Sequence, residues 1–414
     1  MPNLKTKLSR YSKVIENYLF MTFSQGAGLL VGLLLYPYLI RVLGGEVYGT
    51  YIFALSNVQF FTAFISFGFA MPALKKIALF PDDLEVKSRT VSEVLVAKCY
   101  LLLLSIVVLV ILLLAVPFVQ QHYLLYLIVS STVINEILFP VWYFQGIQKM
   151  KFVTCVNLSL RFLTIPFIFI FIKTADDLLK YAAIASVIPL SGGIFTMFYL
   201  KIKENIQFRF VSLSALKPVF RDALPFFWTA ALGTVKSETV TFVIGTFFNM
   251  KDVALYDLAN KIVSIPRLMI TCLNAALFPS VVKDIKPVVV KKIIRYERLI
   301  GIVIMGLIAA FGYWAVLLFG GADMIGAYPL AIVLSLTIYT YLEVGCYINY
   351  IFVPQNRYYF VTKNQFVALV SFLIMGCLGA FILKNILLIV LAYSLAGIVE
   401  IVYCRYLIIK HQLL

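Results

Sequence analysis

Long apolar segments alternate with short polar ones along the whole chain. Six stretches contain no Asp, Glu, Lys or Arg, and they span residues 17–40, 47–74, 99–135, 181–200, 299–322 and 364–383. A helix needs about 20 residues to cross the roughly 30 Å hydrocarbon core of a bilayer. Leu, Ile, Val and Phe fill these stretches without the alternation of a β-strand, so the pattern predicts membrane-spanning helices and not a barrel.

The same pattern predicts twelve helices. We expect them near residues 18–41, 47–74, 93–117, 123–146, 152–173, 178–200, 220–249, 252–282, 297–319, 326–353, 360–383 and 386–409. The polar connections between them are short, and no linker or soluble domain interrupts the chain. The expected fold class is therefore an all-α, polytopic membrane protein.

Composition excludes a soluble fold. The 414 residues are 62% hydrophobic and 13% charged, whereas soluble domains carry about 45–50% apolar and about 25% charged residues. The first apolar stretch, residues 17–40, is longer than the apolar core of a cleavable signal peptide and lacks its small-residue exit. We expect it to remain as a helix.

The formal net charge of +16 suggests nucleic-acid binding until the positions of the charges are considered. Of the 35 Lys and Arg residues, 25 fall on the side of the N-terminus, 5 fall on the opposite side and 5 lie inside predicted helices. This asymmetry follows the positive-inside rule and predicts that both termini are cytoplasmic. We expect membrane lipids as partners, through attraction to anionic headgroups, and no nucleic acid.

Cysteine and histidine offer little chemistry. The six cysteines are scattered singly through apolar sequence, which indicates neither a disulfide framework nor a metal cluster. The two histidines, His122 and His411, lie near predicted helix ends. We expect no metal, no cofactor and no catalytic residue.

A faint internal repeat suggests two halves. Residues 46–56 (EVYGTYIFALS) align with residues 251–261 (KDVALYDLANK) at an offset of 205, which places Tyr51 on Tyr256 and Ala54 on Ala259. Identity is low, but the offset is almost half of the chain. Six helices per half give two halves of the same orientation. We therefore expect bundles at 1–205 and 206–414 around a central cavity, an arrangement suited to alternating access.

Polar residues inside predicted helices are the candidate site, because an ionisable group at membrane depth costs several kcal/mol unless it is paired or faces water. Helix 252–282 carries a polar stripe on one side, spaced as on a single helix face. Its members are Asp257, Asn260, Lys261, Ser264, Arg267, Thr271 and Asn274. We expect this stripe to line a wet cavity; a simple i,i+4 pair of Asp257 with Lys261 in a packed helix is the alternative.

Other helices add single candidates. Lys236 and Glu238 are two residues apart and point to nearly opposite sides of their helix, so one meets the cavity and the other a partner helix, in an order that the sequence leaves open. Glu343 lies in a stripe with Tyr339 and Tyr347 that predicts either a second lumen face or an interhelical pair. The remaining candidates, for a cavity role or a structural pair, are Arg161, Glu136, Glu400 and, for the cavity, Gln25.

The segment PYLIRVLGGEVYGTY, residues 37–51, joins the first two predicted helices. Gly44 and Gly45 give a tight turn its backbone freedom, and Glu46 suits the dipole at the start of a helix. Arg41 is expected at the lipid headgroups or as an outward gate.

Three motifs carry a family resemblance. They are this hinge, FISFGFAMPALKKIA at residues 64–78 and FPVWYFQGIQKMK at residues 139–151, in which Trp142 to Gly146 and two following lysines are the most specific piece. With these motifs the chain resembles the Wzx-type O-antigen flippases. These belong to the polysaccharide transporter branch of the superfamily that includes the multidrug and toxin extrusion (MATE) transporters. Length, helix number and two-bundle repeat agree along the whole chain.

The resemblance implies translocation of an undecaprenyl-pyrophosphate-linked oligosaccharide from the cytoplasmic to the periplasmic leaflet of a bacterial inner membrane. It also implies alternation between inward-open and outward-open states, a cationic central cavity and coupling to an ion, proton or sodium. The positions here that meet that description are Arg161, Lys236, Lys261 and Arg267, with Lys98 at the cytoplasmic mouth. Charge-assisted hydrogen bonds from these cations would bind the pyrophosphate.

Within that description, Asp257, Glu238 or Glu343 would hold the cations or carry a coupled proton, and Tyr339 and Tyr347 would stack on sugars. The protein is expected to work as a monomer, with a polysaccharide polymerase and a chain-length regulator as further partners.

Two other function classes remain open. A membrane-embedded polymerase or glycosyltransferase would place catalytic groups in large outside loops, but the loops here are only a few residues long. A drug or cation antiporter of the related branch would favour an acidic cavity, whereas the polar stripe sets Lys261 and Arg267 against Asp257. A flippase for another lipid-linked glycan is a variant of the main interpretation.

Overall fold

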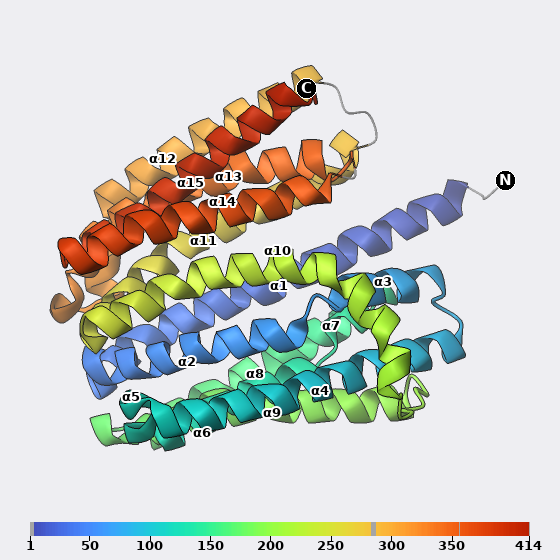
Figure 1. Ribbon diagram of the computed structural model, residues 1–414, viewed down its shortest axis with the longest axis horizontal. Coiled ribbons are helices and arrows are strands. Elements are labelled where there is room, and N and C mark those ends of the chain that lie inside the picture. Colours follow the sequence, from blue (N-terminus) through green and yellow to red (C-terminus); the bar gives the residue numbers. More distant parts are fainter. Residues whose placement is uncertain (1–3, 283–286, 356, 414) are drawn as a thin grey trace. The chain divides into compact units, whose positions relative to one another are not determined.

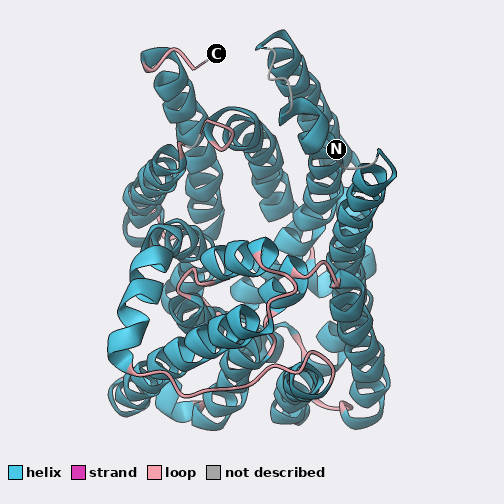
Figure 2. Cartoon of the chain, turned by 90° about the vertical axis from the view of Figure 1, so that its right-hand side faces the viewer, coloured by secondary structure: helices cyan, strands magenta, loops and turns pink. Residues whose placement is uncertain are grey.

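The computed structural model describes residues 4–282, 287–355 and 357–413. Helices make up nearly all of this part of the chain, which contains no strand (Figure 2). Figure 1 labels the helices in chain order. Their bounds in the first half are α1 Leu4–Leu43, α2 Gly45–Ser66, α3 Ala70–Leu79, α4 Leu84–Ala115, α5 Pro117–Gln121, α6 Tyr123–Leu138, α7 Val141–Gly146, α8 Met150–Phe171 and α9 Leu178–Ile202, with a 3₁₀ turn at Ala175–Asp177.

The second half continues the pattern of long helices and short turns. Its elements are α10 Leu213–Phe247, α11 Met250–Val282, α12 Pro287–Gly320, a 3₁₀ turn Ala322–Met324, α13 Ala327–Tyr347, a π-helical turn Ile348–Phe352, α14 Tyr358–Cys377, a second π-helical turn Leu378–Ile382 and α15 Ile386–Lys410. All twelve predicted segments are largely helical, and most of their bounds agree within a few residues. Two of the segments are interrupted: 47–74 between α2 and α3, and 123–146 at residues 139–140, between α6 and α7.

Local chemistry explains several helix ends. Gly44, at φ 80°, makes the turn between α1 and α2 that the sequence predicts. Asp83 caps α4 by accepting hydrogen bonds from the backbone N–H groups of Glu85 and Val86 at 2.9 and 3.0 Å. Asn385 caps α15 in the same way, through the N–H of Leu387 at 2.8 Å.

The helix predicted over residues 47–74 is broken, and this is the main local departure from expectation. Phe67 and Gly68 adopt φ angles of 42° and 70°, which end α2 before α3 begins. A Cβ atom at position 68 would lie 2.6 Å from the backbone nitrogen of Phe227. The break therefore lets two backbones approach closely, and Phe67 stacks on the Phe227 ring with centroids 4.5 Å apart.

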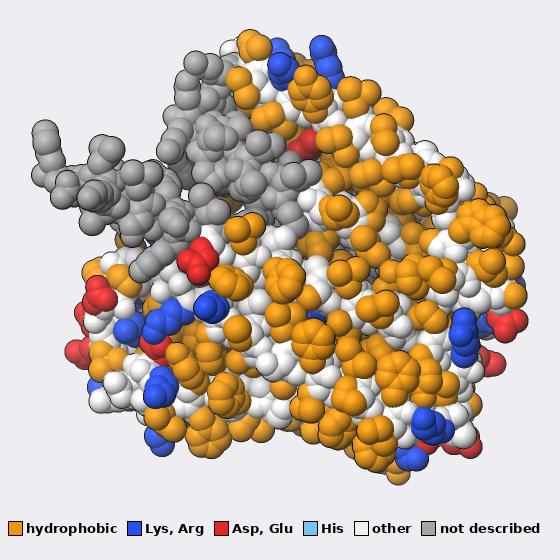
Figure 3. Space-filling model, turned by 180° about the vertical axis from the view of Figure 1, so that it is seen from behind, with side chains coloured by type: hydrophobic (Ala, Val, Ile, Leu, Met, Phe, Trp, Pro, Cys, Tyr) orange, Lys and Arg blue, Asp and Glu red, His pale blue; other side chains and the backbone are white. Residues whose placement is uncertain are grey.

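Many described helices are long and apolar enough to cross a membrane. Nine pass that test alone, and the bent pair of α2 and α3 would make ten. Large apolar side chains are exposed along them, for example on α4, and they dominate the face in Figure 3. Because such exposure is unfavourable in water, the chain is a multi-pass membrane protein. The count of twelve spans stays a prediction.

Contacts divide the chain into two compact units. Unit 1 comprises residues 1–28 and 54–234, and unit 2 comprises residues 29–53 and 235–414. In unit 1, α9 packs on α6 and α8, and Gly193 of α9 lies where a Cβ would touch Asn135 and Leu138 of α6. In unit 2, α13 packs against α11, α12 and α15, and α14 packs against α15. The division into bundles at 1–205 and 206–414 stays a prediction.

Candidate functional site

A cluster of two tyrosines, an aspartate and a lysine lies at the start of the polar stripe in unit 2. Asp257 and Lys261 of α11 form an ion pair, with side chains 16% and 23% exposed. The Lys261 ammonium also donates to the Tyr48 hydroxyl at 3.2 Å. It lies 4.9 Å from the ring centre of Tyr36 and 5.6 Å from that of Tyr48. We call these four residues the tyrosine–lysine cluster.

Close packing of the α1–α2 turn on α11 builds this cluster. The Tyr36 hydroxyl donates to the carbonyl of Ala254 at 2.9 Å, and the rings of Tyr36 and Tyr48 meet edge to face, 5.2 Å apart. A Cβ at Gly49 would lie 1.7 Å from the carbonyl oxygen of Met250. Glycine at position 49 therefore brings α2 directly onto the first turn of α11. Neither tyrosine is among the candidate site residues that the sequence predicts.

Farther along α11, Arg267 reaches α13. Its Nη2 donates to the Thr337 hydroxyl at 2.5 Å, and its guanidinium lies 5.4 Å from the ring centre of Tyr341. Asn260 is half-buried, and its carbonyl accepts a hydrogen bond from Ser264 at 2.7 Å. Asn274 lies outside the described side chains. A cation–π contact and a hydroxyl help to position the Arg267 guanidinium.

Lys236 points to a partner helix. It forms an ion pair with the buried Glu400 of α15, and the Asn364 amide of α14 donates to the other oxygen of that carboxylate at 3.2 Å. Glu238, two residues on, accepts from the Ser237 hydroxyl at 3.4 Å and is half-buried. Glu400, which the sequence left between two roles, thus takes part in an interhelical pair.

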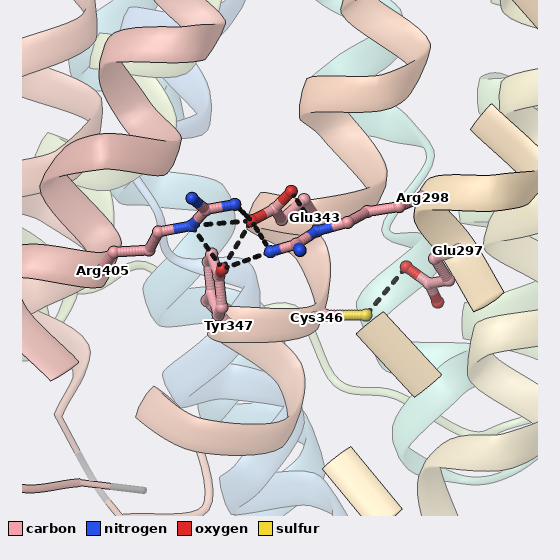
Figure 4. A network of polar contacts seen from close by, with 6 residues as sticks. All are labelled: Glu297, Arg298, Glu343, Cys346, Tyr347 and Arg405. Atoms are coloured by element: carbon pink, nitrogen blue, oxygen red, sulfur yellow. Dashed lines mark hydrogen bonds and ion pairs between the residues drawn. The ribbon is translucent and has the colours of Figure 1, made fainter. Parts of the chain in front are cut away.

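Glu343 of α13 is fully buried and receives two guanidinium groups (Figure 4). Arg298 of α12 donates to both of its oxygens, at 2.8 and 2.6 Å. Arg405 of α15 donates to Oε1 from Nε and Nη2, at 3.1 and 2.6 Å. The Tyr347 hydroxyl completes the arrangement at 2.5 Å. We call these four residues the arginine pair network; Tyr339 lies two turns from Tyr347 on the same helix and is half-buried.

In unit 1, the two cations expected in the cavity, Lys98 and Arg161, each lie against other residues of that unit. Lys98, expected at a cytoplasmic mouth, is only 3% exposed. It donates to a carboxylate oxygen and to the carbonyl of Glu136, at 2.8 and 2.9 Å. Arg161 lies against α1, where a Cβ at Gly28 would be 1.4 Å from its Nη1. Gln25 is exposed on the same helix.

Arg41 stands in the last turn of α1 and is exposed. Its positive charge interacts favourably with the negative, C-terminal end of the helix dipole. Its roles at the headgroups or as an outward gate stay predictions.

This arrangement suits the binding of anions. No group of three or more His, Cys, Asp and Glu residues that could hold a metal ion occurs within the described part of the chain. In unit 2, the cations described above extend from four helices, α10, α11, α12 and α15, and each contacts a carboxylate, a hydroxyl or an aromatic ring. Such preorganised Lys and Arg groups can replace the hydration of a phosphate or pyrophosphate.

Comparison with known sequences shows to which protein family the chain is similar. Residues 14–284 match the family model described as "Polysaccharide biosynthesis protein". A "Putative O-antigen transporter" of Escherichia coli (strain K12) is 24% identical over 266 residues, and the match spans 64% of each chain. A protein of the same description from Shigella dysenteriae is 21% identical over 270 residues, which are 65% of this chain and 67% of that protein.

Comparison with solved structures concerns the fold. "Lipid II flippase MurJ, inward closed conformation" superposes with a TM-score of 0.72 at 15% identity, covering 95% of this chain and 87% of that one. An inward-facing multidrug resistance MATE family transporter superposes with a TM-score of 0.67 at 16% identity, covering 92% and 98%. The predicted all-helical, MATE-like fold is confirmed.

Proposed function

Because the chain belongs to the polysaccharide biosynthesis protein family, we propose that it is a flippase for a lipid-linked oligosaccharide. The proposed cargo is an undecaprenyl-pyrophosphate-linked O-antigen repeat unit or a similar glycan. It would cross a bacterial inner membrane from the cytoplasmic to the periplasmic leaflet, with both termini of the protein in the cytoplasm. Relatives described as O-antigen transporters and a fold shared with a lipid II flippase support this proposal.

The observation that carries the proposal is the set of oriented cations inside a membrane-spanning unit. Lys261 and Arg267 lie on one helix, each held by side chains from other elements. Burying such groups is costly, and packing alone does not require two cations on one helix face. Binding of an anionic headgroup that enters the membrane would explain why Lys261 and Arg267 are both present. The apolar tail of the cargo can stay in lipid throughout.

In the proposed cycle, the pyrophosphate of the cargo replaces Asp257 as the ion-pair partner of Lys261. Arg267 supplies a second set of hydrogen-bond donors to the pyrophosphate. Asp257 would then take up a proton or pair with a sodium ion, which gives a route to ion coupling. We propose that the contacts of Tyr36 and Tyr48 with α11 form and break during alternating access. A polymerase and a chain-length regulator would receive the product, and the flippase would act as a monomer.

Deletion of the gene in the bacterium that carries it tests this function. The lipid-linked unit should accumulate on the cytoplasmic side of the inner membrane, because its synthesis continues while its export stops. The measurement is the share of the lipid-linked glycan that an added, membrane-impermeant glycosidase can reach in spheroplasts. A plasmid copy should restore access, whereas an undiminished periplasmic supply in the deletion strain would rule out the proposed role.

A further inference from the structure

The arginine pair network holds more positive than negative charge. Arg298, Arg405 and Glu343 meet within hydrogen-bond distance, so two guanidiniums share one fully buried carboxylate. Glu297, the neighbouring acid on α12, is turned away and accepts a hydrogen bond from the Cys346 thiol at 2.8 Å (Figure 4). One positive charge of the network is therefore left without a carboxylate at this point.

The two guanidiniums also keep donors available. Their hydrogen bonds to Glu343 and Tyr347 use Nε and Nη2 of both arginines. Among the described residues, Nη1 of neither arginine makes a hydrogen bond. The side chains of Arg298 and Arg405 are 36% and 46% exposed, whereas that of Glu343 is not exposed at all. The buried carboxylate thus holds each guanidinium group through its Nε and Nη2 atoms and leaves Nη1 of both arginines available to a ligand.

The network lies near one end of its helices. Arg405 is five residues before the end of α15, which is about 8 Å at 1.5 Å per residue. Glu343 is nine residues before the end of the helical segment that α13 forms with the π-helical turn Ile348–Phe352, and Arg298 is in the fourth turn of α12. The same end of these elements carries further described cations: Lys291, Lys292, Arg295, Arg357, Lys363 and Lys410. A basic surface of this kind attracts the anionic headgroups of membrane lipids.

We propose that Arg298 and Arg405 form a binding site for the phosphate group of a membrane lipid. Planar guanidinium forks match phosphate oxygens in pairs, and donors that are already oriented lose less entropy on binding. The phosphate would supply the second negative charge of the network. This site is separate from the tyrosine–lysine cluster, and it does not depend on the proposed transport function because an ordinary anionic phospholipid would satisfy it.

The alternative is a diffuse effect of many basic residues at a membrane surface, each contributing about 1 kcal/mol. The two accounts differ in which residues matter. A built site depends on Arg298 and Arg405, whose positions Glu343 fixes. A diffuse surface depends equally on exposed lysines such as Lys291 and Lys292, which belong to the same helix as Arg298.

Counting bound lipids by native mass spectrometry separates them. Purified full-length protein is titrated with short-chain phosphatidylglycerol and, in a second series, with farnesyl pyrophosphate. The wild type should bind at least one of these probes saturably. R405Q should bind it about tenfold more weakly, because the neutral Arg298–Glu343 pair remains and the excess charge is gone. The mirror variant R298Q should behave alike, and K291Q/K292Q, which removes two charges at the same end, should bind within about twofold of the wild type.

The pattern across probes identifies the source of the phosphate. Arginine-dependent binding of phosphatidylglycerol assigns the site to bilayer phospholipid, and arginine-dependent binding of farnesyl pyrophosphate alone assigns it to a prenyl-linked pyrophosphate. Either result supports the site. Three results would overturn it: no saturable binding of either probe by the wild type, unchanged affinity in a folded arginine variant, or an equal loss in K291Q/K292Q.

Discussion

Replacing Lys261 with glutamine is expected to lower export of the surface polysaccharide at least about tenfold while the amount of protein in the membrane stays the same. The substitution removes a charged donor, and hydrogen bonds to charged groups are worth about 1.5–3 kcal/mol, of which 1.4 kcal/mol already corresponds to a factor of about ten. The measurement is surface polysaccharide per cell in a complemented deletion strain, with an immunoblot for the protein. The matched control is K251Q, because Lys251 is an exposed lysine in the first turn of the same helix.

A double variant then separates cargo binding from a structural ion pair. D257N/K261Q removes both charges of the pair and leaves no buried charge unmatched. If the pair only stabilises α11, the double variant should recover the export that K261Q loses. If Lys261 binds the anionic headgroup, export stays low in the double variant. Recovery to the wild-type level would therefore contradict a binding role for Lys261.

Replacing Glu343 with alanine is expected to have the largest effect on stability. It leaves two guanidiniums facing each other without their carboxylate, and breaking a buried ion pair costs about 3–5 kcal/mol. We expect the lower part of that range, because the arginines are 36% and 46% exposed and can turn toward water or headgroups. The measurement is the thermal unfolding of purified protein in detergent.

The control for this substitution is E46A, which removes an exposed carboxylate at the start of α2. E46A should unfold close to the wild-type temperature, because an exposed charge contributes little. E343A should unfold at a clearly lower temperature and accumulate to a lower level in membranes. If the two variants unfold at the same temperature, Glu343 does not hold α12, α13 and α15 together.

Helix positions could be predicted because apolar runs of membrane length are a strong local signal. The turn at Gly44 was also readable, since a glycine pair followed by Glu46 fits a helix end and a helix start. The break at Phe67 to Phe69 was not readable. It depends on the close approach of the Phe227 backbone, which is 159 residues away in the sequence.

The candidate site was predictable as a set of residues but not as a set of contacts. Spacing alone placed Asp257, Lys261 and Arg267 on one face of a helix, because the period of 3.6 is fixed by backbone geometry. The Asp257–Lys261 ion pair follows from the i,i+4 spacing. The other partners come from distant helices: Tyr48 for Lys261 and Thr337 for Arg267, and likewise Glu136 for Lys98 and Glu400 for Lys236.

Arg298 and Arg405 belong to the basic residues of the predicted cytoplasmic side, and nothing in the sequence around them marks them as partners of Glu343. The buried tyrosine and carboxylate at i,i+4 spacing on α13 were the available signal that a cation must be close. That signal indicates that Glu343 needs a cationic partner, but it does not indicate where in the chain this partner lies.

Reconstitution tests the central claim, translocation of a lipid-linked oligosaccharide, most directly. Purified protein is placed in liposomes that contain a fluorescent lipid-linked oligosaccharide, and a membrane-impermeant glycosidase is added outside. Liposomes with the wild-type protein should expose nearly all of the labelled glycan to the enzyme, whereas protein-free liposomes should keep about half protected in the inner leaflet, and K261Q should slow the exposure. If wild-type and protein-free liposomes protect the same share of the glycan, the protein is not a flippase for this cargo.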